Sequence, residues 1–598
     1  MSKTILGAIL GTMAIGFVAC SPVGRKILPV EEEPNVESLQ GNVTGTYLSG
    51  RVAHIRKDFD NAANYYKAVI DKVSNNKQMV NQLYLLLASQ GRIDEAAEYA
   101  QQAIDNHNSS VFAYMVTAAK KVHDGEYADA IRRMNRIEDP LYKSFITPMF
   151  NAWNYAGLKN KKKALTELDK LKKEESFMSV YHQQRAMLLD FMGDNREAQK
   201  EYDIVMKDRD NDLSVRLLEI IANFYVRSGQ KERAQAMMVS TMSHPALEAL
   251  LAVLRSRVFS EDEKNTQPIL SSVRIGAAEA MFAVVSSFKY AEAIDVAHMY
   301  TALTIYLNPN YSTAKIMMAD IFEAREMYDN ANKIYDSIDK NDVGYYPAQI
   351  KKARNLVKME NYEAAEILLK SLSEDYDDMQ IYMELGDMLR LSGRFVEAVE
   401  AYDNAIKRTK NPTNLWVLYY AKGIALERSG QWKEAEKVLF KAYAINKHYL
   451  VLNYIGYTWL LQKHNVEKAL AFIIDAYNQA PDDASINDSL GFALYNLGYY
   501  DKALIYLERA VDMYPSSAIM SSHLGDAYWF AGRKNEAKFQ WQHALTLKDD
   551  SGELDVKLTK LKIKKGIIEE PKLLYNIKHV DKLLKKIKAF SGSTINKI

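Results

Sequence analysis

The chain has 598 residues, of which 48% are hydrophobic and 26% charged, a composition typical of folded proteins that excludes wholesale disorder. Its 77 lysines and arginines nearly balance 76 aspartates and glutamates, so the whole chain lacks the positive excess with which proteins bind nucleic-acid phosphates. The single cysteine excludes an intramolecular disulfide.

The first nineteen residues have the pattern of a signal peptide. Lys3 precedes an uncharged apolar run of fifteen residues, Ile5 to Ala19, which is short compared with the roughly 20 residues that span a bilayer. The run ends in "FVAC", which resembles the lipobox of bacterial lipoproteins, although Phe17 replaces the usual aliphatic residue. This resemblance implies a lipidated Cys20; an incidental cysteine and an uncleaved N-terminal anchor are the alternatives. We predict a signal peptide over 1–19, and a lipidated cysteine and linker over 20–45.

Alanines recur at intervals close to 34 residues along most of the chain. A second small residue stands about twelve positions before several of them, for example Gly386 before Ala398. Small residues let two helices approach closely. The interval predicts a repeated helical hairpin whose second helix opens near each alanine: Ala62, Ala96, Ala130, Ala164, Ala198, Ala234, Ala331, Ala365, Ala398, Ala435, Ala469, Ala503 and Ala537.

Glycines follow the first small position at a spacing of seven residues. Glycine adopts the left-handed conformation that ends many helices, so we predict that these residues form the turn between the two helices of a hairpin. They are Gly91, Gly125, Gly193, Gly229, Gly393, Gly430, Gly498 and Gly532.

The pattern L-G-x-x-Y, then A, then an aromatic or apolar residue, then A and P, is clearest in "DSLGFALYNLGYYDKALIYLERAVDMYP", which begins at Asp488. It identifies the tetratricopeptide repeat. The sequence therefore predicts an all-α tetratricopeptide-repeat α-solenoid of about thirteen or more repeats, with arrays over 46–240 and 313–552. The pattern degrades between Ala234 and Ala331, and we predict an irregular helical hinge over 241–312.

Residues 553–598 hold twelve lysines and five acidic residues, and we predict a basic helical cap or tail there. Val580, Leu583, Leu584, Ile587 and Phe590 fall on one helical face. This face favours a helix that caps the last repeat; a helix on an anionic membrane surface is the alternative.

No nucleophile, nucleotide-binding or metal-binding motif is present, so we predict a protein that is not an enzyme and has no cofactor. Asp208, Asp210, Asp212 and Glu219 match four ligand positions of a calcium loop, but Leu213 replaces the glycine that this loop requires. We therefore predict no metal site.

Binding is the function that an array of hairpins supports without special chemistry. In tetratricopeptide-repeat proteins the first helix of each hairpin lines a concave groove. Aromatic rings supply contact area and asparagines can bond a peptide backbone. Counting from the small residues predicts a peptide-binding groove formed by Tyr420, Asn453, Tyr457, Phe492, Tyr495, Asn496, Asp526 and Trp529.

The complete layout resembles the long tetratricopeptide-repeat lipoproteins of Gram-negative bacteria. Some of these act as outer-membrane adaptors that bring substrates to a periplasmic carboxyl-terminal processing protease. The resemblance implies a lipid-anchored scaffold that faces the periplasm, with the outer membrane as the expected location. Its partners would be proteins or extended peptides, candidates being such a protease and its substrates, and not nucleic acid. The alternatives are an envelope assembly factor with an uncleaved anchor and a regulator of an envelope polymer enzyme.

Overall fold

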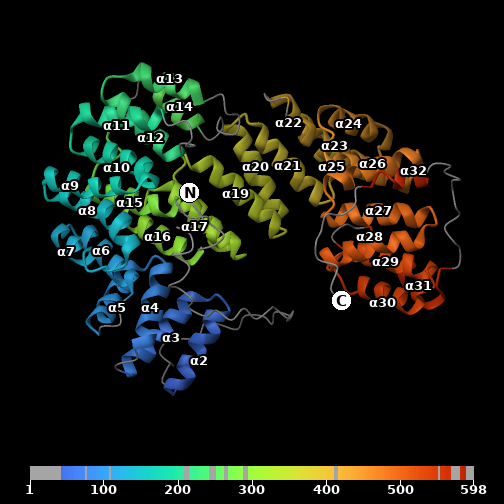
Figure 1. Cartoon of the computed structure of the whole chain (residues 1–598), viewed down its shortest axis with the longest axis horizontal. Coiled ribbons are helices and arrows are strands. Elements are labelled where there is room, and N and C mark those ends of the chain that lie inside the picture. Colours follow the sequence, from blue (N-terminus) through green and yellow to red (C-terminus); the bar gives the residue numbers. More distant parts are fainter. Residues whose placement is uncertain are drawn as a thin grey trace. The chain divides into compact units, whose positions relative to one another are not determined.

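A computed structural model describes residues 42–73, 77–106, 110–207, 214–241, 251–260, 267–286, 294–409, 412, 415–549, 553–567 and 580–587. Over these residues the chain forms 31 α-helices, short 3₁₀ and π segments, and no strand (Figure 1). The predicted signal peptide, Cys20 and most of the predicted linker lie outside the described residues.

The helices divide into two compact units, residues 1–368 and 369–598, and the division falls inside α20 (Tyr362–Asp375). The predicted boundaries at 240 and 312 lie within the first unit. The helices of unit 1 before α20 are α2 (Val43–Ile55), α3 (Phe59–Lys72), α4 (Lys77–Ser89), α5 (Ile93–Asp105), α6 (Val111–His123), α7 (Tyr127–Met134), α8 (Thr147–Gly157), α9 (Lys161–Leu168), α10 (Met178–Phe191), α11 (Asn195–Lys207), α12 (Val215–Arg227), α13 (Lys231–Thr241), α14 (Ala252–Phe259), α15 (Val273–Ser286), α16 (Ile294–Leu307), α17 (Ser312–Ala324), α18 (Tyr328–Asp336) and α19 (Tyr345–Lys358).

Unit 2 continues the hairpins and ends in two short helices. Its helices after α20 are α21 (Met379–Leu391), α22 (Phe395–Arg408), α23 (Leu415–Arg428), α24 (Trp432–Ile445), α25 (Tyr449–Leu461), α26 (Val466–Gln479), α27 (Ala484–Asn496), α28 (Tyr500–Met513), α29 (Ala518–Phe530), α30 (Lys534–Ala544), α31 (Val556–Lys565) and α32 (Val580–Leu584).

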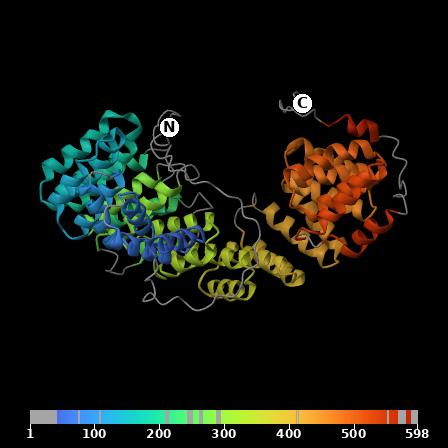
Figure 2. The same ribbon diagram turned by 90° about the horizontal axis from the view of Figure 1, so that it is seen from below.

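The predicted hairpins are confirmed. Each of the thirteen alanines lies near the start of a second helix, from Ala62 in α3 to Ala537 in α30, and each is 0% exposed. All eight predicted turn glycines have positive φ, between 74° and 83°. A Cβ on Gly525 would lie 2.6 Å from Trp541, because the two helices approach closely at that glycine. Seen from below, the hairpins of each unit stack one after another (Figure 2).

The irregular segment 241–312 is part of the packing of unit 1. Its helices α15 and α16 pair with each other; α15 contacts α6, α8 and α10, and α16 contacts α4 and α6. Those partners are the first helices of their hairpins, so α15 and α16 lie along the inner face of the first array (Figure 1). A Cβ on Gly276 of α15 would lie 2.0 Å from the indole of Trp153 in α8, so only a glycine admits this approach.

The basic C-terminal region also packs against repeats. α31 contacts α30, and α32 contacts α26. Val580 and Leu583 of the predicted apolar face are buried, and Leu584 and Ile587 pack against the same core, whereas Phe590 lies outside the described residues. The apolar face of α32 thus packs against α26, while α31 packs against α30 of the last hairpin.

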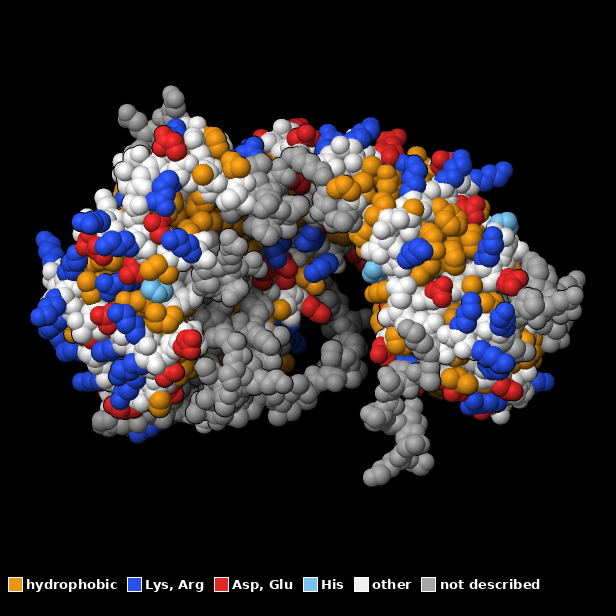
Figure 3. Space-filling view, turned by 45° about the horizontal axis from the view of Figure 1, so that its top comes forward, with side chains coloured by type: hydrophobic (Ala, Val, Ile, Leu, Met, Phe, Trp, Pro, Cys, Tyr) orange, Lys and Arg blue, Asp and Glu red, His pale blue; other side chains and the backbone are white. Residues whose placement is uncertain are grey.

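The charged surface agrees with the near-zero net charge. On the part of unit 1 that faces the viewer in Figure 3, lysine and arginine side chains lie interspersed with aspartate and glutamate side chains. Among the described residues, no helix combines the length and the hydropathy that crossing a membrane requires.

Candidate protein-binding groove

The inner face of unit 2 is formed by the first helices of its five hairpins, α21, α23, α25, α27 and α29. Every predicted groove residue lies on one of these helices: Tyr420 on α23, Asn453 and Tyr457 on α25, Phe492, Tyr495 and Asn496 on α27, and Asp526 and Trp529 on α29. The structure divides these residues into an open part, a covered part and a part used for internal packing.

The open part is a pocket between α21 and α23. Its volume is about 210 Å³, and it is lined by Met383, Asp387, Arg390, Val417, Leu418, Tyr420, Ala421 and Ile424. Burial raises the pKa of Tyr420 to about 12, so its hydroxyl stays protonated and can donate a hydrogen bond. Arg390 donates to Asp387 at 3.1 Å. The pocket therefore combines apolar walls with a donor and an ion pair, as ligand sites usually do.

Aromatic rings continue along the inner face from this pocket. Tyr420 meets Tyr454 edge to face with centroids 5.8 Å apart, Tyr457 lies 5.7 Å from Phe492, and Phe492 stacks on His523 at 4.3 Å. Between them, the buried Oδ1 of Asn453 accepts no hydrogen bond. Because this atom is buried, a bound backbone N–H cannot reach it unless neighbouring side chains move.

Two predicted groove residues are used by the fold itself. Tyr495 is 7% exposed, and its ring packs beside Tyr500 and Phe530. Asn496 donates from Nδ2 to the carbonyl oxygen of Phe492, 2.8 Å away.

The remaining predicted residues contact the chain's own C-terminal segment, residues 553–567. Lys562 donates to both carboxylate oxygens of Asp526, at 2.8 and 2.7 Å, and Asp526 also accepts from the indole Nε1 of Trp541 at 2.8 Å. A Cβ on Gly566 would lie 2.0 Å from Trp529, so the backbone there lies against the indole. Tyr457 donates to Glu553 at 3.2 Å.

A buried ion pair joins α27 to α29. The Nδ1 atom of His523 is 3.0 Å from both carboxylate oxygens of Asp488. Burial opposes the charged imidazolium, but the Asp488 carboxylate outweighs it and raises the pKa of His523.

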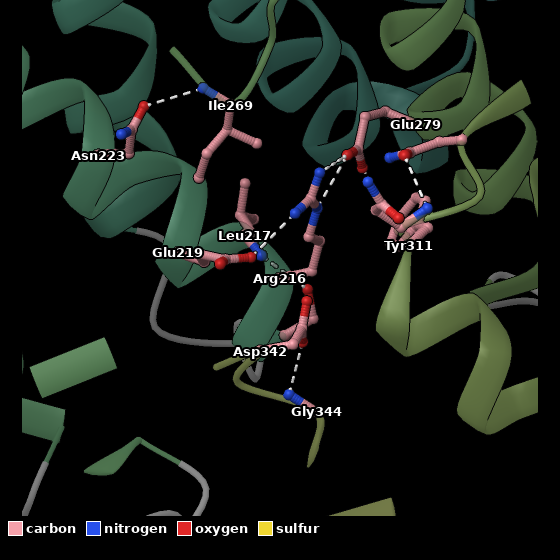
Figure 4. Close-up of polar contacts among 12 residues, drawn as sticks. Arg216, Leu217, Glu219, Asn223, Ile269, Glu279, Tyr311, Asp342 and Gly344 are labelled. Atoms are coloured by element: carbon pink, nitrogen blue, oxygen red, sulfur yellow. Dashed lines mark hydrogen bonds and ion pairs between the residues drawn. The ribbon is translucent and has the colours of Figure 1, made fainter. Parts of the chain in front are cut away.

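In unit 1 a polar cluster that the repeat pattern does not predict joins α12 to α15 and Tyr311. Arg216 of α12 donates to Glu219 at 2.9 Å and to Glu279 of α15 at 2.7 Å, and Tyr311 donates to the other oxygen of Glu279 at 2.5 Å. Figure 4 shows the guanidinium pointing between the two carboxylates. The only signal in the sequence is one acidic residue in the otherwise apolar "GAAEAMFAVV".

Arg216 stays charged in this cluster. Its burial disfavours the cation, but the Glu279 and Glu219 carboxylates hold its pKa above the ordinary value. Glu219, a candidate calcium ligand by sequence, instead accepts from Arg216 and, at 2.9 Å, from Arg257. Within the described ranges, histidine, cysteine, aspartate and glutamate side chains form no group of three or more that could hold a metal ion.

A second, smaller pocket of about 180 Å³ lies beside this cluster. Asn223 fixes its rim, donating to the carbonyl of Gln267 at 2.9 Å and accepting from the N–H of Ile269 at 3.2 Å (Figure 4). The pocket lining is Glu219, Ala222, Asn223, Val226, Leu254, Arg257, Val258, Gln267 and Ile269.

Known sequences agree with this architecture. The tetratricopeptide repeat family matches residues 50–111, 350–413 and 490–546. A TPR repeat-containing protein of Pseudomonas aeruginosa is 28% identical over 170 residues, 28% of each chain. The BBSome complex member BBS4 of Bos taurus is 26% identical over 190 residues, 32% of each chain. The matches thus span about a third or less of these relatives.

The similarity to two solved structures extends over longer stretches. The APC/C hetero-tetramer Cut9–Hcn1 is 15% identical with a TM-score of 0.35, and yeast Tom70 is 13% identical with a TM-score of 0.34. Each comparison covers 89% of this chain and 98% of the other. The confirmed hairpins and the family matches together show that the chain is a tetratricopeptide-repeat α-solenoid, a fold that is typically non-catalytic and generally serves as a scaffold for binding other proteins.

Proposed function

We propose that this protein is a lipid-anchored adaptor of the bacterial cell envelope, which holds partner proteins on the inner face of unit 2. The observation that carries the proposal is the open end of that face: a pocket of about 210 Å³ with Tyr420 and the 39% exposed Val417 in its wall. Apolar walls with a few polar groups, here Tyr420 and the Arg390–Asp387 pair, suit an extended protein segment.

The partner class rests on the resemblance to envelope lipoproteins. In the proposed role the protein faces the periplasm from the outer membrane and brings substrates to a carboxyl-terminal processing protease. Affinity capture of the tagged full-length chain from envelope extracts tests this role, and we expect a protease and its substrates in one complex. Capture of an envelope polymer enzyme instead would favour the regulator.

A charge in the open pocket should abolish this binding. Val417→Glu places a carboxylate in the pocket wall, where an apolar partner side chain would have to desolvate it. Val396→Glu is the matched control, because Val396 is 59% exposed on α22 and does not line the pocket. We expect capture to be lost with V417E and kept with V396E; equal capture by both variants would place the binding elsewhere.

Anchoring is proposed from the sequence around Cys20. Cys20→Ser should prevent labelling with a radioactive fatty acid, and should release the chain from membranes or leave its precursor uncleaved. The repeats should stay folded, since Cys20 precedes the first hairpin. Unlabelled wild-type protein with unchanged membrane attachment in C20S would favour the uncleaved anchor.

A further inference from the structure

The C-terminal segment, residues 553–567, binds the inner face of unit 2 in the manner of a ligand. It contacts α23 and α25 near its start, through Glu553, and α29 near its end, through Lys562 and Gly566. These helices are the first helices of three different hairpins, and α31 also packs against α30, the second helix of the last hairpin. The segment therefore runs along the groove across several repeats, as a bound partner segment would.

Two sites on the inner face bind charged side chains of the segment. At the first, the Glu553 carboxylate accepts from Arg428 at 2.8 Å and from the Tyr457 hydroxyl at 3.2 Å. At the second, Lys562 is enclosed with Asp526, and their side chains are 14% and 12% exposed. Pairs that combine charge with hydrogen bonds select both the sign and the position of the group they receive. Together the two sites recognise a carboxylate and an ammonium group that are nine residues apart in the bound segment.

The segment combines these polar contacts with limited apolar packing, in which Ile563 and Ile567 lie against the core of unit 2. Thr559 is the buried side chain of α31, at 2% exposed, whereas Val556, Leu558 and Leu561 are 45%, 46% and 42% exposed. Helices that belong permanently to a core bury such side chains. Three of its apolar side chains thus remain in water, and the hydrophobic stabilisation lost on release is confined to Ile563, Ile567 and the contact of Gly566 with Trp529.

We propose that the inner face of unit 2 recognises a basic helical segment of a partner protein, with a carboxylate nine residues before a lysine, and that residues 553–567 compete with it. This inference rests on the proposed function and adds to it the chemistry of the partner segment and a means of regulation. The tethered segment blocks the Arg428–Tyr457 and Asp526 sites until a partner segment displaces it.

A labelled peptide with the sequence of residues 553–567, added to the full-length chain, tests the exchange. Lys562→Gln in the chain removes the ammonium from the tethered copy, while the peptide keeps its lysine. A tethered segment competes at a local concentration on the order of millimolar. We therefore expect fluorescence anisotropy to show at least tenfold tighter peptide binding by K562Q than by the wild type.

Two further variants make the result specific. Lys560→Gln makes the same change in charge at an exposed lysine of α31 and should bind the peptide as the wild type does. Adding Asp526→Asn to K562Q should abolish the tighter binding, while the new amide oxygen can still accept from the Trp541 indole. Peptide binding within twofold in the wild type and K562Q, including no binding by either, would overturn the inference, as would unchanged binding by the double variant. Circular dichroism melts verify that each variant is folded.

The two proposals fail separately. If V417E abolishes partner capture but K562Q and the wild type behave alike with both peptide and partner, the competition by residues 553–567 is wrong and the adaptor role stands. If the peptide results are as expected but V417E still captures the partner, the open pocket is not where the partner binds, although the exchange is real.

Discussion

At the scale of single residues, burial decides which charges stabilise the fold and which remain available for binding. Arg216 in unit 1 and Asp526 in unit 2 both face inward, but their partners differ. The carboxylates around Arg216 come from helices of the same folded core. The cation on Asp526 comes from the C-terminal segment, which leaves three apolar side chains exposed. The Arg216 cluster therefore stabilises the fold, whereas Asp526 can exchange Lys562 for the ammonium group of a partner.

Arg216→Met should therefore be strongly destabilising. The change leaves two buried carboxylates without their shared cation, and breaking a buried ion pair costs about 3–5 kcal/mol. Urea unfolding followed by circular dichroism measures the loss. Arg132→Met is the control, because Arg132 pairs with Asp129 on the surface with 69% of its side chain exposed, and such pairs contribute less than about 1 kcal/mol. Similar losses in the two variants would show that the cluster is not a stabilising unit.

At the scale of elements, every hairpin turn described next keeps the same left-handed backbone conformation, even where the residue is not glycine. Turns without glycine adopt the same left-handed conformation at Lys57, Lys159, Glu326, Glu360 and Lys463, with φ between 55° and 63°. A side chain is strained in this region, and glycine is not. The missing glycines therefore weaken some hairpins without removing them.

Paired substitutions at two turns test this strain. Gly393, with φ of 79°, should lose about 1 kcal/mol as Gly393→Ala, whereas Glu360→Gly, at φ of 59°, should gain up to about 1 kcal/mol. Nothing lies within 4 Å of a Cβ built on Gly393, so the effect of G393A reports backbone conformation alone. Hydrogen exchange in α19–α20 for E360G and in α21–α22 for G393A gives the local values. Changes of the same sign in both variants would contradict the argument.

At the scale of the whole molecule, the two units should respond to pH in opposite directions through one buried histidine each. Burial and nearby Arg325 lower the pKa of His298 in α16 to about 3. The unfolded chain takes up that proton below about pH 6.5 and the folded chain does not, so unit 1 loses roughly 1.4 kcal/mol per pH unit as pH falls from 6.5. The pKa of His523 is raised, so its contribution to unit 2 is complete below pH 6.5 and is lost as pH rises.

Hydrogen exchange of α16 and α29 amides as a function of pH measures these two contributions. As the pH falls from 6.5 to 4.5, the wild type should lose about 2.3 kcal/mol of protection in α16 through this histidine, and His298→Gln should remove that loss. His523→Gln should remove the extra protection of α29 at low pH and leave α16 unchanged. The expectation fails if either variant keeps the pH slope of the wild type in its own helix.

The sequence alone determined the repeated unit. The spacing of alanines and glycines encodes helix approach and turn conformation, and both are local properties of one hairpin and its neighbour. The thirteen buried alanines, the eight left-handed glycines and the close fit of Gly525 to Trp541 were therefore predictable. The same register placed every groove residue on a first helix.

Only the tertiary structure decided what occupies the inner faces. Helices α15 and α16 line the first array and residues 553–567 cross the second, yet neither follows the repeat pattern. Their positions depend on contacts between residues far apart in the chain, such as Arg216 with Glu279 and Arg428 with Glu553. A short periodic pattern carries no information about such pairs, because it constrains only residues within one repeat and the next.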